Sequence, residues 1–374
     1  MGWDNLTMVT GIVYSEEYLN HITGSHVESP QRLTSTIKAL KERGIWEKNP
    51  KYTIVTPRKA TLDQIRTVHS DKMIQRAREV AIEAKSGGSL EYLDGDTVMC
   101  GDSYEVALLA AGGVLEGVDQ ILEGKIQNAF ALVRPPGHHS NREYSRGFCV
   151  FNNAAIALHY LITEKNIKKA VIVDWDCHHG NGTQDIFYEG IPGTDKGDFM
   201  YISSHQDGRT LYPGSGFINE MGKGRAKGRI LNIPLAPRTT DEAIREIYNE
   251  IVVPVLEEFN PEFIIVSAGF DAHFSDPITN LGFSAQWYSE MLQKLKKVAD
   301  KTAKGRILVT LEGGYELKAI SSSIVNCLQT LGGDPCTERN DNAPKTEADI
   351  LGYTRENVIK AIKDRFSEFW KFQK

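Results

Sequence analysis

The stretch Ala170-Val-Ile-Val-Asp-Trp-Asp-Cys-His-His-Gly-Asn181 joins a short apolar run to a cluster of polar side chains. The first four residues are apolar and mostly β-branched, which is typical of a strand buried on both faces. Similar runs predict eight strands, at residues 8–14, 52–56, 129–133, 170–174, 199–203, 230–235, 263–267 and 306–311. Longer segments with helical periodicity lie between them. This alternation predicts an α/β fold with a mostly parallel central sheet flanked by helices.

The helical periodicity predicts helices at residues 29–43, 103–123, 152–165, 241–259, 284–304 and 318–331. Ser29 is the expected N-cap of the first helix, with Pro30 at its first helical position and Gly44 closing it. A polar segment precedes a further amphipathic helix at 354–374, which we expect to pack on the body of the protein. The apolar stripe of that helix holds Val358, Ile362, Phe366 and Phe369. We expect residues 1–374 to form a single domain.

The composition excludes several classes of protein. With 374 residues, 41% hydrophobic and 25% charged, the chain has the composition of a globular protein with a large core. Its net charge of -6 opposes binding to nucleic acid. Five cysteines without a C-x-x-C pair predict a reducing compartment. The sequence has no secretory signal or membrane span, so we expect a cytoplasmic protein and leave its oligomeric state open.

Polar residues cluster directly after four of the predicted strands, where ligands bind in open α/β sheets. These four segments are Arg134-Pro-Pro-Gly-His-His139, Asp174-Trp-Asp-Cys-His-His-Gly-Asn181, Ser267-Ala-Gly-Phe-Asp-Ala-His273 and Glu312-Gly-Gly-Tyr315. Two adjacent histidine pairs use four of the ten histidines, which packing alone does not explain.

Three of these residues form a candidate metal site. Asp176 and His178 are two positions apart, so on an extended segment they point to the same side. Asp271, from another strand end, would complete an Asp-His-Asp set with one coordination position open, as in catalytic zinc sites. Iron and manganese also suit these ligands. The alternative is a structural hydrogen-bond network with Asp271 as a helix cap.

Two other segments gain a function only beside such a metal. His138 and His139 would supply the proton-transfer groups that hydrolysis needs, although a His pair after two prolines is also compatible with a simple turn. Gly313 and Gly314 allow close backbone approach, which would let Tyr315 lean over the metal. The alternative there is an ordinary turn.

The strings RPPGHH, GFCVFNN, VDWDCHHGNGT, SAGFDAHFSDP and LEGGY, in this order and spacing, resemble the zinc-dependent histone deacetylase family. That family includes bacterial and archaeal amidohydrolases and acetylpolyamine amidohydrolases, and the likeness runs from about Ser29 to Tyr315. It implies the single-domain arginase-deacetylase fold and one Zn²⁺ held by Asp176, His178 and Asp271. It also implies that His138 and His139 are the tandem catalytic histidines and that Tyr315 meets the substrate carbonyl.

The resemblance implies further site residues. Asp174 matches the carboxylate behind the first histidine, and Phe148 and Tyr212 match the aromatic walls of an acyl-lysine tunnel. Asp96 corresponds to the rim acid that holds the substrate backbone. Gly147 and Gly313 are the remaining expected substrate contacts, and Arg32 resembles the arginine of an internal exit channel. A potassium site is implied at Asp174, Asp176, His178, Ser203 and Ser204.

The sequence departs from parts of the family at two positions. Asn181 stands where one branch has an aspartate behind the second histidine, so we expect His139 to have a lower pKa than His138. Ile278 follows Asp276-Pro277 where polyamine-specialised members have a gatekeeping glutamate, which disfavours a polyamine substrate.

The predicted activity is therefore zinc-dependent hydrolysis of the acetamide of acetyl-lysine, on a protein or a small amine. In the expected mechanism His139 transfers the proton, His138 with Asp174 stabilises charge, and Tyr315 donates to the oxyanion. Alternatives are an acetylpolyamine or other acyl amidohydrolase, a dinuclear manganese ureohydrolase, and a non-catalytic metal-binding protein.

Overall fold

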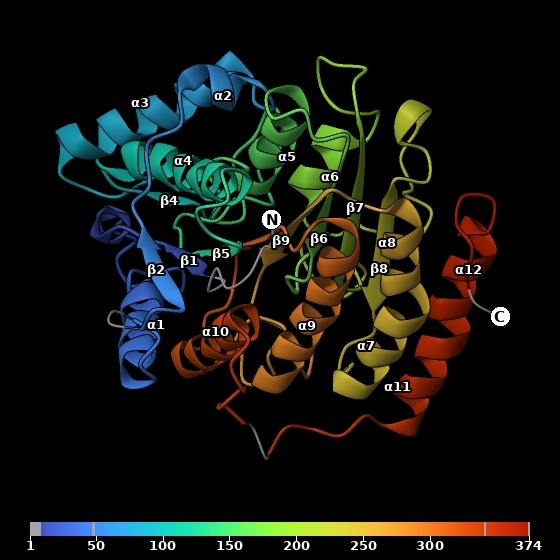
Figure 1. Cartoon of the computed structure of the whole chain (residues 1–374). Coiled ribbons are helices and arrows are strands. Elements are labelled where there is room, and N and C mark those ends of the chain that lie inside the picture. Colours follow the sequence, from blue (N-terminus) through green and yellow to red (C-terminus); the bar gives the residue numbers. More distant parts are fainter. Residues whose placement is uncertain (1–8, 47–48, 340–341, 373–374) are drawn as a thin grey trace, which may run out of the picture.

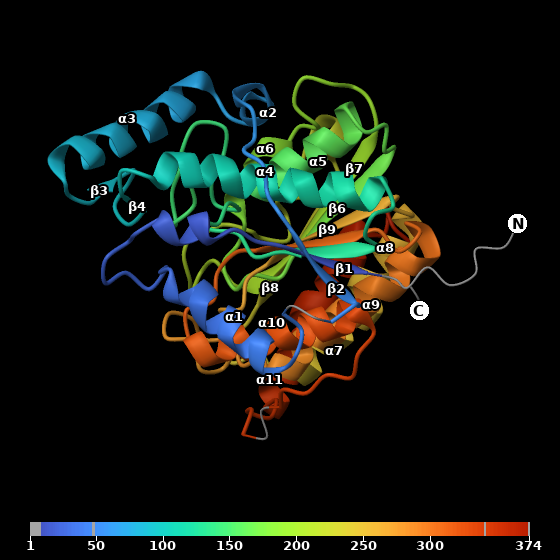
Figure 2. The ribbon, with the colours of Figure 1, turned by 60° about the vertical axis from the view of Figure 1, so that its left-hand side comes forward.

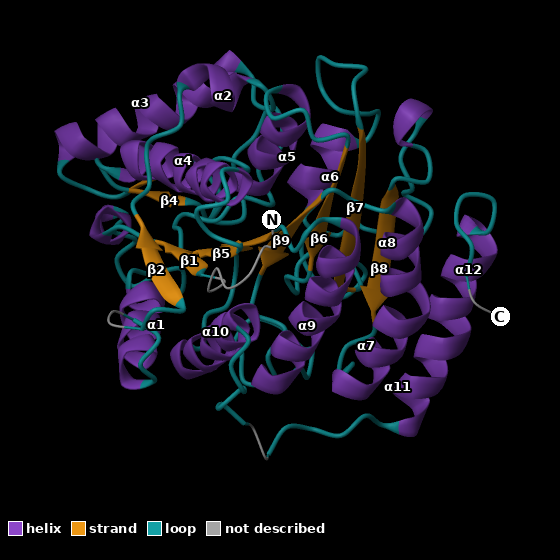
Figure 3. Ribbon diagram, viewed as in Figure 1, coloured by secondary structure: helices purple, strands orange, loops and turns teal. Residues whose placement is uncertain are grey.

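A computed structural model describes residues 9–46, 49–339 and 342–372. Eight parallel strands form one sheet in the order β2-β1-β5-β10-β9-β6-β7-β8 (Figures 1 and 3). Their bounds are β1 Thr10–Val13, β2 Tyr52–Val55, β5 Asn128–Ala131, β6 Lys169–Asp174, β7 Asp198–Gln206, β8 Ile230–Leu235, β9 Phe263–Ala268 and β10 Ile307–Leu311. Each predicted run overlaps one of these strands, which confirms the α/β fold class; Met8, at the start of the first run, lies outside the described residues.

Helices cover both faces of the sheet (Figure 2). One face carries α2 Leu62–Arg66, α3 Asp71–Gly87, α4 Ser103–Leu122, α5 Asn153–Thr163 and α6 Asn181–Phe187. The other carries α1 Gln31–Glu42, α7 Asp241–Ile247, α8 Val253–Phe259, α9 Ala285–Thr302 and α10 Leu317–Gly332. The sequence prediction missed α2, α3, α6 and the small antiparallel pair β3 Glu91–Tyr92 and β4 Val98–Met99.

The predicted start of α1 was wrong by one residue. Pro30, not Ser29, is the N-cap, and no side chain caps the helix. The Ser29 carbonyl accepts from Arg32 N in a tight turn, whereas the first α-helical bond runs from Thr34 N to the Pro30 carbonyl. The predicted end is confirmed, because Gly44 follows the helix with a φ of 64° that favours glycine.

The C-terminal helix begins earlier than predicted. It comprises α11 Ala348–Tyr353, a π-helical stretch Thr354–Ile359, and α12 Lys360–Phe366. The first turns were missed because only Ile350 of α11 is buried, which gives little apolar periodicity. The helix packs on β8 and α7 as expected, with Val358, Ile362 and Phe366 buried. The helix also ends earlier than predicted, at Phe366, so Phe369 lies beyond it and is only partly buried. Gln373 and Lys374, the end of the predicted range, lie outside the described residues.

The order of the strands decides where the polar segments meet. β5, β10, β9 and β6 are consecutive neighbours in the sheet, although the chain visits them in the order β5, β6, β9, β10. All are parallel, so the four loops that follow them emerge side by side at one edge. Among the described residues, every helix is too short or too polar to span a lipid bilayer.

Candidate active site

Two carboxylates and one imidazole converge at this edge of the sheet. Asp176 and His178 come from the loop after β6, and Asp271 comes from the loop after β9. His178 Nδ1 lies 3.2 Å from Asp176 Oδ1 and 2.9 Å from Asp271 Oδ2. All three side chains are buried, and one potential ligand atom from each lies within 4.8 Å of the others. The structure therefore brings together the three residues predicted to hold a metal.

The ionisation of these groups depends on one another. Burial lowers the pKa of His178, but hydrogen bonds to Asp176 and Asp271 raise it to about 10. Burial and the charge of Asp176 raise the pKa of Asp271. In the metal-free chain a proton on His178 therefore lies between the two carboxylates. A cation bound by the three side chains would take the place of that proton.

Neighbouring backbone groups orient the two carboxylates. Cys177 N donates to Asp271 Oδ1 and Gly313 N donates to Asp176 Oδ2, both at 2.8 Å. A Cβ atom at Gly313 would come within 2.6 Å of Asp271 Oδ2 and 2.7 Å of Asp176 Oδ2, so only glycine fits beside the carboxylates. The sequence predicts that Gly313 contacts the substrate. In the structure its N–H group donates to Asp176. The mixed oxygen and nitrogen donors fit a single divalent cation such as zinc.

The loop after β5 places two histidines beside this group. The rings of His138 and His139 are 4.1 Å apart, and the His139 ring is 5.9 Å from that of His178. His138 Nδ1 lies 3.1 Å from Asp174 Oδ2. Burial lowers the pKa of His138, but the charges of Asp176 and Asp174 raise it to about 10. His138 is therefore held as an imidazolium in the metal-free chain.

The second histidine has a neutral partner. The side-chain nitrogen of Asn181 donates to His139 Nδ1 at 2.7 Å, because its oxygen then accepts from Gly182 N and from the guanidinium of Arg146. Burial and the charge of His138 hold the pKa of His139 well below its ordinary value. His139 is therefore neutral near pH 7, in line with the sequence prediction. Because Nδ1 accepts a hydrogen bond, the proton of the neutral ring is on Nε2.

Tyr315 reaches the same place from the loop after β10. Its N–H donates to Asp276 Oδ2 at 2.8 Å, and its ring lies edge-on to Phe148 at 5.7 Å. Burial and the charge of Asp271 raise the pKa of Tyr315 well above its ordinary value, so its hydroxyl remains a hydrogen-bond donor. The Arg32 guanidinium lies 5.2 Å from the ring centre and Nε donates to the Gly314 carbonyl at 2.7 Å.

The other donors of Arg32 are also engaged. Nη1 donates to Glu28 Oε1 at 3.0 Å, and Nη2 donates to the Glu312 carbonyl at 2.5 Å. Arg32 thus braces the tyrosine loop. The role of Arg32 in an exit channel stays a prediction.

Aromatic side chains border the histidines and the tyrosine. Tyr212 is 42% exposed, and its ring lies 5.1 Å from that of His139. Phe148 follows Gly147, and both have positive φ values, of 67° and 59°. A positive φ at a phenylalanine is a strained conformation that is characteristic of functional sites. Asp96 lies at this rim with part of its surface in solvent, and partial burial together with the charge of Asp94 raises its pKa.

The residues of the expected potassium site also lie close together. Asp174 is the register partner of Ser203 on the neighbouring strand. The Ser204 hydroxyl is buried and has no hydrogen-bond partner among the described residues. A buried oxygen without a donor fits a monovalent cation bound behind the histidine site.

Three residues of this site were not predicted. Tyr201 donates to Asp174 Oδ2 at 2.9 Å, Arg146 orients Asn181, and the buried carboxylate of Glu312 accepts from the His138 loop. Glu312 carried a signal in the sequence, since it is an acidic residue that directly follows an apolar strand. Tyr201 and Arg146 carried none, because an aromatic residue in a strand and a loop arginine are common.

Comparison with known proteins agrees with this geometry. Residues 26–331 match the family model of the histone deacetylase domain. A probable deacetylase of Archaeoglobus fulgidus is 41% identical over 312 residues, which cover 83% of this chain and 82% of that protein. Histone deacetylase 14, chloroplastic, of Arabidopsis thaliana is 36% identical over 367 residues, which cover 94% of this chain and 82% of that protein.

A solved structure has the same fold. The HDA15 HD domain has a TM-score of 0.84 and 31% sequence identity, with coverage of 97% of this chain and 96% of that one. The family match spans most of the chain, and the two relatives cover four fifths or more of it. This single-domain α/β protein therefore belongs to the histone deacetylase family of hydrolases.

Proposed function

We propose that this protein is a zinc-dependent deacetylase that hydrolyses the acetamide of acetyl-lysine or of a similar acetylated amine to acetate and the free amine. One observation carries the proposal. Asp176, His178 and Asp271 converge at the edge of the sheet where the His138–His139 pair and Tyr315 also lie. A protein that only stored or displayed a metal would need none of the last three.

Asp176, His178 and Asp271 would hold one Zn²⁺ per chain. When bound, zinc would polarise the acetamide carbonyl and lower the pKa of a water molecule to about 7. A dinuclear manganese site is disfavoured, because the only other group of three potential ligands among the described residues is His138, Cys149 and Glu312. That group offers no second carboxylate to bridge two ions.

His139 is the group that takes the proton from the attacking water and returns it to the leaving amine. Its low pKa keeps it neutral near pH 7, which a base requires. The base form needs a free lone pair on Nε2, so the Asn181 amide must turn to accept from Nδ1–H. His138, paired with Asp174, remains charged and stabilises the negative charge that develops on the substrate oxygen.

Tyr315 and the rim residues act on the substrate. The Tyr315 hydroxyl, protonated because its pKa is raised, donates to the developing oxyanion. Phe148 and Tyr212 would flank the apolar stem of the acyl-lysine side chain. Asp96 and Gly147 at the rim would bind the substrate backbone. Ile278 has no negative charge that could attract a polyamine. Its presence therefore favours acetyl-lysine as the substrate.

Two further assignments belong to the proposal, a bound potassium ion and a location in the cell. A potassium ion would be bound by Asp174, Asp176, His178, Ser203 and Ser204, where the unpartnered Ser204 hydroxyl supports a cation. A cytoplasmic location follows from the sequence expectation alone.

The test is a substrate panel with the purified, zinc-loaded protein. We expect kcat/KM to be highest for acetyl-lysine peptides and lower for acetylpolyamines and other short acyl amides, with one zinc per chain. Binding of zinc to the metal-free protein should release protons, because zinc displaces the proton of His178. A preference for polyamines would replace the proposed substrate. Zinc binding without hydrolysis of any substrate would support the non-catalytic alternative.

A further inference from the structure

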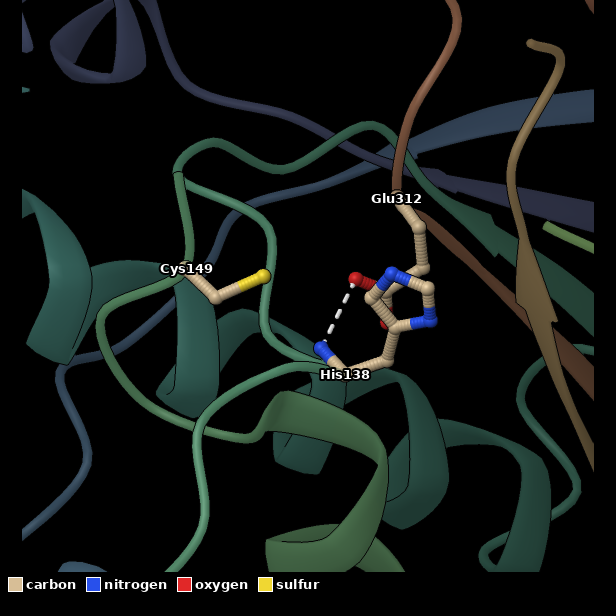
Figure 4. A group of neighbouring side chains, drawn as sticks. All are labelled: His138, Cys149 and Glu312. Carbon is tan, nitrogen blue, oxygen red and sulfur yellow. Dashed lines mark hydrogen bonds between the residues drawn. The ribbon is translucent and has the colours of Figure 1, made fainter. Parts of the chain in front are cut away.

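Glu312 is a buried carboxylate at the end of β10 to which the proposed mechanism gives no role. Figure 4 shows its side chain extending toward His138, with one carboxylate oxygen hydrogen-bonded to the backbone nitrogen of that residue. Oε2 accepts from Gly137 N at 2.7 Å and from His138 N at 3.1 Å, and Oε1 accepts from the Ser267 hydroxyl at 3.1 Å. Glu312 is fully buried.

The histidine loop needs this acceptor. Pro135 and Pro136 have no N–H groups, so Gly137 and His138 supply the first backbone donors after the two prolines. A Cβ atom at Gly137 would lie 2.5 Å from the Phe151 carbonyl oxygen, which indicates how closely the loop is enclosed. A buried N–H without an acceptor is costly, so the carboxylate determines where these two residues lie.

Glu312 also joins the histidine loop to the other loops of the site. Ser267 belongs to β9 and precedes Asp271 by four residues, and Gly313 N donates to Asp176 Oδ2. The main-chain carbonyl of Glu312 accepts from Arg32, which also holds the Gly314 carbonyl. Glu312 therefore joins the histidine loop to the end of β9, and its neighbour Gly313 joins the same segment to Asp176 in the loop after β6.

A metal does not explain this cluster. His138, Cys149 and Glu312 have potential ligand atoms close together, and Figure 4 shows the Cys149 side chain directed toward the carboxylate. However, Glu312 Oε2 already accepts two N–H groups and His138 Nδ1 faces Asp174. Burial and the charge of Glu312 raise the pKa of Cys149 well above its ordinary value, so the thiol stays protonated. A protonated thiol is a poor ligand.

The hydrogen bonds of Glu312 do not require its charge. Burial raises its pKa to about 7. A protonated carboxyl group can still accept both N–H groups through one oxygen while it donates to the Ser267 hydroxyl through the other. A carboxamide of the same size can make the same set of bonds.

We propose that Glu312 is a positioning residue of the deacetylation reaction, which sets the place of His138 and His139 relative to the substrate by holding the N–H groups of Gly137 and His138. The inference rests on the proposed function. In this proposal the reaction depends on where a side chain of the length of glutamate places its acceptor oxygen. It does not depend on the negative charge.

Two substitutions separate position from charge. Glu312→Asp keeps the charge but withdraws the carboxylate by one methylene, so we expect kcat to fall by about 10–100-fold, as for a misplacement of about 1 Å. KM and the zinc content should stay as in the wild type. Glu312→Gln removes the charge but keeps the acceptor, and kcat should stay within about 3-fold of the wild type. Thr310→Val is the control, because Thr310 is buried on the same strand and its hydroxyl has no partner among the described residues.

A second measurement does not depend on catalysis. Amide hydrogen exchange of Gly137 and His138 in the metal-free protein should be at least about 10-fold faster in Glu312→Asp than in the wild type, and close to the wild type in Glu312→Gln. Unchanged kcat and unchanged exchange in Glu312→Asp would overturn the inference. The inference would also be overturned if kcat fell as far in Glu312→Gln as in Glu312→Asp, because the charge of Glu312 would then determine the rate. If the wild type itself hydrolyses no acyl amide, it is the proposed function that fails, whatever the exchange rates.

Discussion

The strands at the centre of the sheet and the loops that follow them are buried to the same degree but contain opposite chemistry. Ile172 on β6 and Val266 on β9 are buried, and so are Asp176 and Asp271 in the loops that follow these two strands. In the strands, burial of apolar groups stabilises the fold. In the loops, burial of carboxylates and histidines costs free energy unless each group is paired.

The difference separates residues that stabilise the fold from residues that serve a reaction. Asp176, Asp271 and Glu312 lie within a few ångströms of His178 or His138, so their charges are partly compensated. A core made only of apolar residues would be simpler to fold. The retained charges at one edge of the sheet therefore indicate function, and substitutions in the two regions should have different signatures.

The largest expected effect is the loss of the metal from the loops. Asp271→Asn should lower deacetylation by at least about 1,000-fold and abolish stoichiometric zinc, because metal catalysis contributes several kcal/mol. The free energy of unfolding of the metal-free protein should change by less than about 1 kcal/mol, since asparagine keeps an oxygen for Cys177 N–H. Ile172→Ala should do the reverse, with a loss of about 2–5 kcal/mol of stability and full zinc content. Equal losses of activity in Asp271→Asn and Ile172→Ala would contradict the distinction between residues that serve the reaction and residues that stabilise the fold.

Removal of one hydroxyl from the site should have the next largest effect. Tyr315→Phe should lower kcat by about 10²–10³-fold with zinc content unchanged, because an oxyanion donor is lost. Tyr288→Phe is the matched control in the core, where the hydroxyl is buried and has no partner among the described residues. Steady-state kinetics of both variants make the comparison. Unchanged turnover in Tyr315→Phe would remove the tyrosine from the mechanism.

The pH dependence of stability extends the comparison to a structural histidine. Burial lowers the pKa of His69 from 6.5 to about 4, whereas the pKa values of His138 and His178 are raised. Between about pH 4 and 6.5 the unfolded chain binds a proton that folded His69 does not, so stability falls as the pH falls. The contribution is up to about 1.4 kcal/mol per pH unit. Urea unfolding of His69→Gln across this range should show a shallower slope, and an identical slope would mean that His69 is protonated when folded.

The smallest expected effect is at the exposed rim. Ile278→Glu adds a charge where polyamine-specialised relatives are expected to have one, and Ile278→Gln is a neutral control of similar size. Because exposed charges contribute only about 0.2–1 kcal/mol, kcat/KM for acetylpolyamines relative to peptides should rise by about 2–5-fold in the glutamate variant alone. A parallel change in both variants would show that side-chain shape, and not charge, acts at the rim.

Much of the fold and of the site was predictable from short-range patterns. Eight apolar β-branched runs predicted the eight strands, since buried strands of this kind need no tertiary information to be seen. The grouping of Asp176 and His178 followed from a spacing of two. The start of α11 was missed because only Ile350 is buried there, which gives little apolar periodicity. Helix α3 was missed although its buried residues recur at helical spacing between the N-cap Ser70 and the C-cap Gly88, so the sequence did contain its signal.

The sequence by itself determined the strands, the polar segments after four of them, and the family to which these motifs point. Only the tertiary structure decided that β5, β10, β9 and β6 are neighbours, and hence that Asp271 meets His178. It also decided the partners of the two histidines, Arg146 through Asn181 and Glu312 through the backbone. The physical reason is that local side-chain pattern records burial, whereas which buried groups pair depends on contacts between distant segments, 93 residues apart for His178 and Asp271 and 174 for His138 and Glu312.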